Sequence, residues 1–474
     1  MTYAIYPPIG LARLGNSDTE FFIGPERRGS RGTEVQPNGT EAEVVAFKDS
    51  TFRVKPQAAR FSVFEIPDGG GAPRPAQFPP GTTVKWSVQL INKKDGINRP
   101  GSPPAAPMTP TVKPGREDRI IDTGPQSITG PSAGPSTLTG SYRQHSVRLG
   151  ELRTDSAQRL LVVGAEGRSE SPTNSPIGGS FYNNADWHDD VADGPVTAEI
   201  TLPAGPPPAC APAWVIVGPP DFAPGAEGVV TLYDVILQVA LDEGWTTLPA
   251  QPFFVDHIRP MLERARNLRW VNNGSMWPLI SDDWTALAST SAASKSFRED
   301  NAMLVRAAED QLHDFTLRGW QSDYLDKWVA GTFDRGSTPN PDLAASLTRA
   351  VLDGSVGQGF FPGIEAGIIV TDPALYAQPF DFRFDHSKVA PGDITALMAL
   401  PWQADFLKCS GSWWPAQRPD VAPQANGTRP PWLRPSMNHK RLVADVMKLG
   451  VVAPHTDAGG HEVFVETGRD PQLG

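Results

Sequence analysis

The sequence predicts an α+β fold, with a β-rich, sandwich-like N-terminal half packed on a mainly helical C-terminal half. Short β-branched runs separated by Pro, Gly, Asn and Asp occupy the first 225 residues. Apolar residues take helical spacing from about residue 231 onward. Hydrophobic residues make up 39% of the 474 residues, enough to bury a sizeable core. We expect two domains, 1–225 and 226–474.

The expected strands are short and lie between turn-forming residues. They are FRVKP from Phe52, TTVKWSVQLI from Thr82, RLLVVG from Arg159, VTAEITL from Val196 and AWVIVG from Ala213. The segment 98–141 is rich in Pro, Gly, Ser and Thr. Such a composition is typical of a long irregular excursion, and we expect it to be flexible in part.

The helices are expected mainly in the second half. Residues 231–243 carry apolar side chains at helical spacing and end before Gly244, a natural C-terminal cap. Further helices are predicted over 257–267, 297–312, 341–352, with Asn340 as N-cap, and 438–449. The final apolar run, HEVFVET over 461–467, predicts a strand that returns to a sheet.

Charge and cysteine content exclude several classes of protein. The net charge of -11 and the pI near 5.3 argue against a nucleic-acid or anionic-membrane partner, since both require a basic surface. No apolar run is long enough to cross a bilayer, and residues 1–17 lack the pattern of a signal peptide. We therefore expect the protein to be located in the cytoplasm, at least while it matures. Export without a signal peptide is left open. Cys210 is predicted to be a buried thiol at the entry to a strand.

The densest chemistry lies in PWQADFLKCSGSWWPAQRPD, residues 401–420. If Pro401 opens a helical turn, Asp405 and Cys409 share one face, and Trp413 and Trp414 follow within five residues. A thiol, a carboxylate base and an indole are the parts needed to build a cysteine tryptophylquinone. Spacing alone favours the alternative, a buried cysteine beside aromatic core residues.

The chain resembles the LodA-like quinoproteins, the lysine ε-oxidases and glycine oxidases that carry cysteine tryptophylquinone. Residues 401–420 look like the family's cofactor segment. Other matching stretches follow the family's order along nearly the whole chain: IYPPIGLARLGNS, FFIGPE, LRTDSAQRLLVVGAEGRS, FYNNADWHDDVADGPVTAEI, PAWVIVGPPDFAPG, GFFPGIEAG and VFVETGR. Family members are longer, so this chain resembles a version with shortened loops, including the stretch between Cys409 and the tryptophans.

The resemblance implies a role for each residue of this segment. Cys409 matches the thioether partner, and Asp405 matches the carboxylate that the family needs for cofactor formation. We prefer Trp414 over Trp413 as the quinone, because Pro415 would restrict the backbone beside it.

The resemblance also places a Gly- and Phe-rich stretch near the quinone. Phe360, Phe361 and Glu365 are therefore candidate pocket residues, with ordinary packing as the alternative.

The implied activity is oxidative deamination of a primary amine of an amino acid. The amine would give an aldehyde or oxoacid and ammonia, and O2 would be reduced to H2O2, with Asp405 as the base that removes the proton from the substrate carbon. The family also implies a separate flavoprotein for cofactor maturation, and we expect a homo-oligomer. The alternatives are an amine dehydrogenase with a protein electron acceptor and a non-catalytic β-rich binding protein. The amine itself is left open.

A second polar cluster lies in NNADWHDDVADG and contains Asp186, His188, Asp189, Asp190 and Asp193. Clustered carboxylates favour a Ca²⁺ loop, yet the spacing fits no standard EF-hand. A structural turn with capping carboxylates and a wall of the active site are the other interpretations. The family resemblance supports a structural or pocket role, and we expect no metal.

Overall fold

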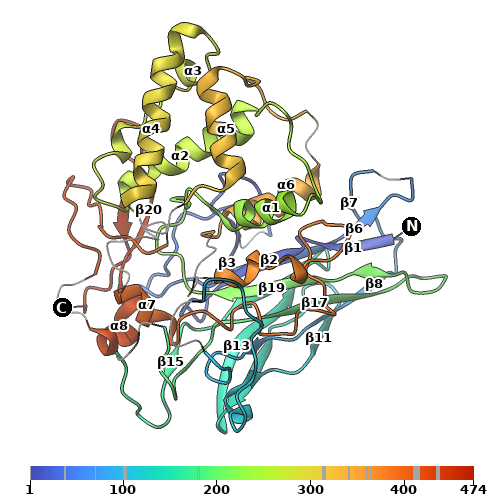
Figure 1. Ribbon diagram of the computed structural model, residues 1–474. Helices are drawn as coiled ribbons and strands as arrows, with labels where there is room; N and C mark the ends of the chain where they lie inside the picture. The colour runs from blue at the N-terminus through green and yellow to red at the C-terminus, as the bar shows by residue number, and fades with distance from the viewer. Residues whose placement is uncertain are drawn as a thin grey trace.

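The computed structural model describes residues 2–36, 39–69, 71–99, 104–178, 180, 182–311, 316–339, 342–357, 361, 365–408, 417–433 and 438–473. Strands fill the first half of the chain and helices dominate the second, which confirms the predicted α+β class. Figure 1 shows helices α1 to α6 gathered on one side of the β-rich part, with α7 and α8 beside its edge.

The strands are mostly short, and β6, β13 and β17 are the long ones. Their bounds are β1 Thr2–Tyr6, β2 Ile9–Arg13, β3 Phe22–Ile23, β4 Thr33–Val35, β5 Glu41–Glu43, β6 Gln57–Ile66, β7 Arg74–Pro75, β8 Thr83–Val88, β9 Ile91–Asn92, β10 Ile121–Asp122, β11 Gln126–Thr129, β12 Ser136–Tyr142, β13 His145–Thr154, β14 Leu160–Gly164, β15 Ser169–Glu170, β16 His188–Asp189, β17 Ala192–Thr201, β18 Cys210–Ala211, β19 Ala213–Gly218, β20 Val451–Thr456 and β21 Glu462–Thr467.

The strands form two connected layers with one apolar core between them. One layer runs β12–β13–β14–β6, and the other runs β11–β8–β17–β19–β2. Inward residues of both layers, Leu152 and Val162 from one and Trp86 and Val196 from the other, belong to the same buried cluster. Alternate residues of a strand point to opposite faces, so this shared cluster makes the β-rich part sandwich-like.

Two strand predictions need correction. The segment 98–141 is not one irregular excursion, because β10, β11 and most of β12 lie within it. The run from Phe52 contributes only an isolated bridge between Lys48 and Val54, and β6 begins at Gln57, after a proline that has no backbone N–H to donate to a ladder. Cys210 lies in β18 but is half-buried rather than buried.

The helices largely follow the predicted periodicity. They are α1 Leu232–Asp242, α2 Arg259–Asn267, α3 Trp284–Leu287, α4 Lys295–Gln311, α5 Gly319–Ala330, α6 Leu343–Asp353, α7 Trp402–Lys408 and α8 His439–Asp445, with a π-helical turn at Phe254–Ile258 before α2 and a 3-10 turn at Val446–Lys448 after α8. Gly244 follows α1 with a φ of 69°, as expected for a helix end.

The N-cap predicted for α6 is wrong. Asn340 lies outside the described residues, and the cap is Asp342, whose carboxylate accepts the N–H of Ala344 at 2.8 Å. Helix α5 was missed, although Trp320, Tyr324 and Trp328 recur at four-residue spacing and are buried. The C-terminal run forms β21, which pairs with β20 in a two-stranded sheet.

Two large hydrophobic cores join the halves of the chain. Residues of the β-rich half pack with Trp402, Phe406 and Trp432 in one core, and Ile9 and Trp214 pack with α1, α2 and α5 in the other. The division at residue 225 stays a prediction, since each core draws on both halves. Within the described residues, no helix has the length and apolar character needed to cross a membrane.

Candidate active site

Helix α7 leads directly to the segment that carries the predicted chemistry. Asp405 lies within α7, which confirms the predicted helical turn, and the helix ends at Lys408. Cys409, Trp413 and Trp414 lie outside the described residues, as does Phe360. The structure therefore describes the residues that flank the segment 409–416 on both sides.

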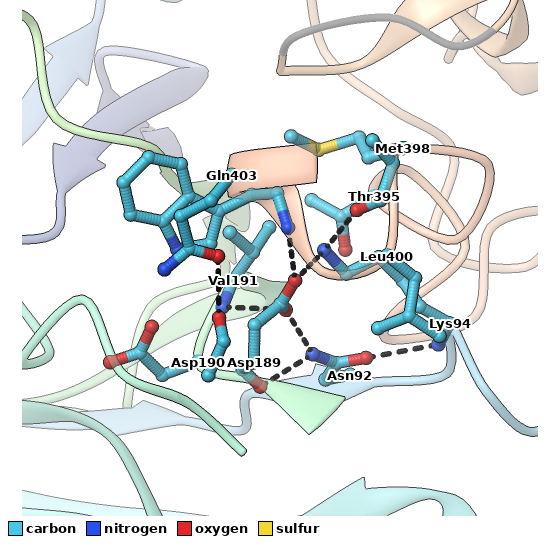
Figure 2. Close-up of polar contacts among 12 residues, drawn as sticks. Asn92, Lys94, Asp189, Asp190, Val191, Thr395, Met398, Leu400 and Gln403 are labelled. Carbon is cyan, nitrogen blue, oxygen red and sulfur yellow. Dashed lines mark hydrogen bonds and ion pairs between the residues drawn. The ribbon is translucent and has the colours of Figure 1, made fainter. Parts of the chain in front are cut away.

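A buried carboxylate holds the start of α7. Asp189 Oδ2 accepts the backbone N–H of Trp402 at 2.9 Å, and Asn92 Nδ2 donates to Asp189 Oδ1 at 2.9 Å. Figure 2 shows Asp189 between Asn92, Lys94 and the chain around Leu400. A carboxylate at a helix N-terminus satisfies a free N–H and interacts favourably with the helix dipole, so Asp189 fixes where α7 begins.

Lys94 neutralises this carboxylate. Its Nζ lies 2.5 Å from Asp189 Oδ2, and both side chains have no exposed surface. Lys94 Nζ also donates to the carbonyl of Ala399 at 2.9 Å, two residues before Pro401. Burial lowers the pKa of Lys94, and the charge of Asp189 opposes that shift. The pair ties β16 to the chain entering α7.

Asp193 holds the preceding loop in the same way. Its carboxylate accepts the N–H and the hydroxyl of Thr395 at 2.8 and 2.6 Å, and Oδ2 accepts the indole N–H of Trp214 at 3.0 Å. Burial raises the pKa of Asp193 to about 6. This carboxylate therefore organises backbone from the C-terminal half.

The remaining members of the acidic cluster have separate partners. Asp186 pairs with Arg119 at 2.6 Å and with Arg143 at 3.0 Å. His188 packs against Tyr142 with ring centroids 4.8 Å apart, and burial lowers its pKa. Nowhere in the described part of the chain do three His, Cys, Asp or Glu side chains gather to hold a metal ion. Asp186 and His188 thus have contacts within the protein, and the absence of a metal stays a prediction.

Asp190 is the unusual member of the cluster. Its Oδ2 accepts the N–H groups of Gly167 and Arg168 at 2.7 and 3.1 Å, while Oδ1 is buried and accepts no hydrogen bond within the described residues. Burial and the neighbouring Asp189 charge raise the pKa of Asp190 to about 8. A carboxyl with this pKa holds its proton at neutral pH.

A second buried network lies where the chain leaves the segment 409–416. Gln417 Nε2 donates to Glu365 Oε1 at 2.5 Å, and Glu365 also forms an ion pair with Arg13 and accepts the hydroxyl of Ser355. Glu365 and Gln417 are each 2% exposed. The Cβ of any other residue at Gly218 would lie 3.1 Å from Glu365 Cγ, so glycine allows this close approach.

The two flanks of the segment are joined directly. Arg418 Nη1 donates to the carbonyl of Phe406, in α7, at 2.7 Å. The backbone N–H of Phe222 donates to the carbonyl of Gln417 at 3.1 Å, and the ring of Phe222 packs against those of Phe406 and Trp432. The segment 409–416 is thus bounded on both sides by buried, hydrogen-bonded structure.

A polar cavity opens beside the Glu365 network, at the carboxyl ends of the parallel strands β2 and β19. Its lining includes Arg13, Asp221, Glu227, Ser355 and Gln417. Burial raises the pKa of Asp221 to about 6, and the nearby Arg13 charge opposes the shift. A cleft with convergent polar groups and a perturbed carboxyl is a reasonable place for a small polar ligand.

Comparison with known protein families identifies the family of this chain. A family model described as "L-Lysine epsilon oxidase N-terminal" matches residues 6–217, and one described as "L-lysine epsilon oxidase C-terminal domain" matches residues 307–426. The chain belongs to the LodA-like family. The C-terminal match of this LodA-like chain includes Asp405, Cys409, Trp413 and Trp414.

Individual relatives agree with this placement. The L-lysine 6-oxidase of Marinomonas mediterranea is 26% identical over 86% of this LodA-like chain and 71% of its own length. Crystal structures of the L-Lys epsilon-oxidase from the same organism, including one of its Schiff base intermediate with L-Lys, cover 100% of this chain and 95% of theirs, with TM-scores of 0.81 and 20% sequence identity. At that identity the structures show that the fold is shared.

The described residues beside the segment 409–416 are compatible with a protein-derived quinone cofactor, as the LodA-like family implies. Gln417 Oε1, directly after the segment, is buried and accepts no hydrogen bond in the part of the chain that the structure describes. An unsatisfied polar atom of this kind is costly unless a donor is supplied, and none of the described residues supplies one.

Sequence reasoning on this LodA-like chain named Glu365 and Phe361 as candidate pocket residues, and both roles stay predictions. Glu365 was predicted as a pocket residue, and it contacts Gln417 at the exit of the segment. Phe361 is buried, 5.0 Å from the ring of Tyr182 in a separate small cluster. Arg13, Asp221 and Gln417 were missed, although all three lie in the stretches that carried the family resemblance.

Proposed function

We propose that this chain is an oxidase that removes the amino group from a primary amine of an amino acid. The products would be an aldehyde or oxoacid, ammonia and H2O2, with O2 as the electron acceptor. The observation that carries the proposal is the match of the C-terminal family model to a region that contains Asp405, Cys409 and both candidate tryptophans. The relative that carries the name L-lysine 6-oxidase supports an amino acid as substrate.

The cofactor in this proposal is a cysteine tryptophylquinone formed from Cys409 and Trp414, with Trp413 as the alternative. Such a quinone supplies the two-electron sink that no ordinary side chain provides. The protein's own residues position it. Asp189 and Lys94 fix the start of α7, and the Glu365 network fixes the chain after the segment. Positioning from rigid, buried elements is what such chemistry requires.

Asp405 is the proposed base. It lies in α7, four positions before Cys409, which is the spacing at which two residues of a helix share one face. Its carboxylate would take the protons released during cofactor assembly and, in turnover, the proton from the substrate carbon. Both roles need a carboxylate next to the ring, which the helical spacing favours.

Maturation would depend on a separate flavoprotein, as the family resemblance implies. We also propose cytoplasmic maturation and assembly of several copies of the chain.

Co-expression with that flavoprotein provides the test. Intact mass spectrometry should show a chain that has gained two oxygen atoms and lost about four hydrogens, two from the ring carbons that become carbonyls and two from the thioether bond, whereas the chain expressed alone should keep its unmodified mass. An unshifted mass after co-expression contradicts the proposal. Peroxide formation in a panel of amino acids and amines would then name the substrate, and turnover with an artificial dye but without peroxide would instead indicate a dehydrogenase.

A further inference from the structure

The polar cavity at the ends of β2 and β19 is lined by a carboxylate, Asp221, for which the described residues provide no ion-pair partner. Asp221 is half-buried and lines the cavity, and its Oδ1 accepts the N–H of Ala223 at 2.7 Å. Within the described residues it forms no ion pair. Its second oxygen is thus available to a ligand in the cavity.

The other charged groups that line the cavity are already paired. Arg13 pairs with Glu365, Arg31 with Glu462, and Lys55 with Glu34 and Glu20 at 2.6 and 2.8 Å. Among the acids, Glu227 and Asp353 both pair with Arg264, at 3.1 and 2.7 Å. Asp221 therefore adds to the lining a negative charge that forms no ion pair with a described residue, although the charge of Arg13 acts on it, and this favours a cation.

Gln417 provides a second, independent sign of a missing donor. It lines the same cavity and is 2% exposed, and its Oε1 accepts no hydrogen bond within the described residues. Its Nε2 donates to Glu365, which fixes the orientation of the amide, so the unpaired atom is the acceptor oxygen. Two acceptors without donors suit a group that carries several N–H bonds and a positive charge.

We propose that this cavity binds the primary ammonium group of the amine substrate, with Asp221 as its counter-ion and Gln417 Oε1 as a second acceptor. This inference rests on the proposed function and adds to it the residues that recognise the substrate. An ammonium group has three donors and no acceptor, which matches an ionised carboxylate and an amide oxygen. Gln417, which lines the cavity, directly follows in sequence the segment 409–416, which would carry the reacting group.

Binding to the unmodified full-length chain tests the proposal without requiring the quinone. The probe is butylammonium, titrated into chain expressed without the flavoprotein and followed by calorimetry, with 1-butanol as its neutral counterpart. We expect Asp221→Asn to weaken butylammonium binding at least about tenfold, because a charge-assisted hydrogen bond is lost. We expect 1-butanol to bind wild type and variant equally.

Asp372→Asn is the matched control. Asp372 is also half-buried and accepts an N–H two residues on, from Ala374 at 2.9 Å, but it does not line the cavity. We expect this variant to bind butylammonium as wild type does. Gln417→Leu should weaken binding as well, which gives a second variant if Asp221→Asn folds poorly.

The outcomes separate this inference from the proposed function. Absence of butylammonium binding to wild type, or equal binding by Asp221→Asn, overturns the ammonium site even if mass spectrometry shows the quinone. Loss of binding in Asp221→Asn together with an unshifted mass after co-expression would leave the ammonium site standing and overturn the oxidase.

Discussion

Asp189 caps the helix that begins at Trp402, with a carboxylate oxygen 2.9 Å from the backbone nitrogen. These two residues are 213 positions apart, so one end of the helix that leads to Cys409 is set by the β-rich half. The capping oxygen also faces Lys94 at 2.5 Å. The position of α7 therefore depends on a buried ion pair.

Asp189→Asn should destabilise the protein by about 3–5 kcal/mol, because it leaves the charge of Lys94 buried without a partner. Asparagine can still accept the N–H of Trp402, so the loss of stability measures the effect of removing the negative charge at this position. Urea midpoints of the unmodified chain measure it. Glu199→Gln is the control, since it removes one partner of the exposed Lys85–Glu199 pair and should change stability by less than about 0.5 kcal/mol. Equal midpoints for the two variants would contradict the prediction.

Glu365→Gln should lower the stability of the folded protein by a similar amount, because the buried charge of Arg13 would lose its carboxylate partner. Replacing Arg13 by Met in the same chain should recover part of the loss, since the unpaired charge is then gone. The recovery is read from urea midpoints in a double-mutant cycle. Glu299→Gln, in an exposed pair on α4, is the control. Additive effects of the two substitutions would mean that the ion pair does not couple these residues.

Asp190 should make stability depend on pH. The pKa of this carboxyl is about 8 in the folded protein and near 3.8 in the unfolded chain. Between these values the unfolded chain releases the proton and the folded protein keeps it. The contribution of Asp190 therefore lowers stability as pH rises from about 4 to about 8, by at most about 1.4 kcal/mol per pH unit, and is constant above.

Asp190→Asn should abolish this contribution. The stability of the variant relative to wild type should rise between about pH 5 and about pH 8, as measured by urea midpoints at each pH. Asp326→Asn removes an exposed carboxylate on α5 and is the control. The stability of this variant relative to wild type should not change with pH. A difference for Asp190→Asn that does not change with pH would show that the folded protein does not retain this proton.

The sequence predicts local structure in this protein better than the contacts that build the site. Runs such as Leu160–Gly164 and the capping residue Thr231 specify their own conformation, since propensity and capping act over a few residues. The pairing of Lys94 with Asp189 and of Glu365 with Gln417 depends instead on tertiary packing across 95 and 52 positions. Nothing in their immediate neighbourhoods identifies these partners. Family resemblance supplied Glu365 as a candidate, and the contacts supplied Arg13 and Asp221.

Asp405 provides the sharpest test of the cofactor chemistry. After co-expression with the flavoprotein, Asp405→Asn should keep the unmodified mass, because cofactor assembly needs a base beside the ring and an amide cannot accept the protons. Asp405→Glu keeps a carboxylate one methylene further from α7. It should acquire the mass shift and form peroxide at least about tenfold more slowly, since a base that is displaced transfers protons less efficiently.

Asp445→Asn on α8 is the control for both variants and should mature and turn over as wild type does. Mass spectrometry and peroxide yield are measured on the same preparations, so that turnover is expressed per matured chain. If Asp405→Asn acquires the mass shift and loses only turnover, Asp405 acts in catalysis alone. If it matures and turns over normally, the base must come from another residue, and the position of Asp405 in α7 no longer supports the mechanism.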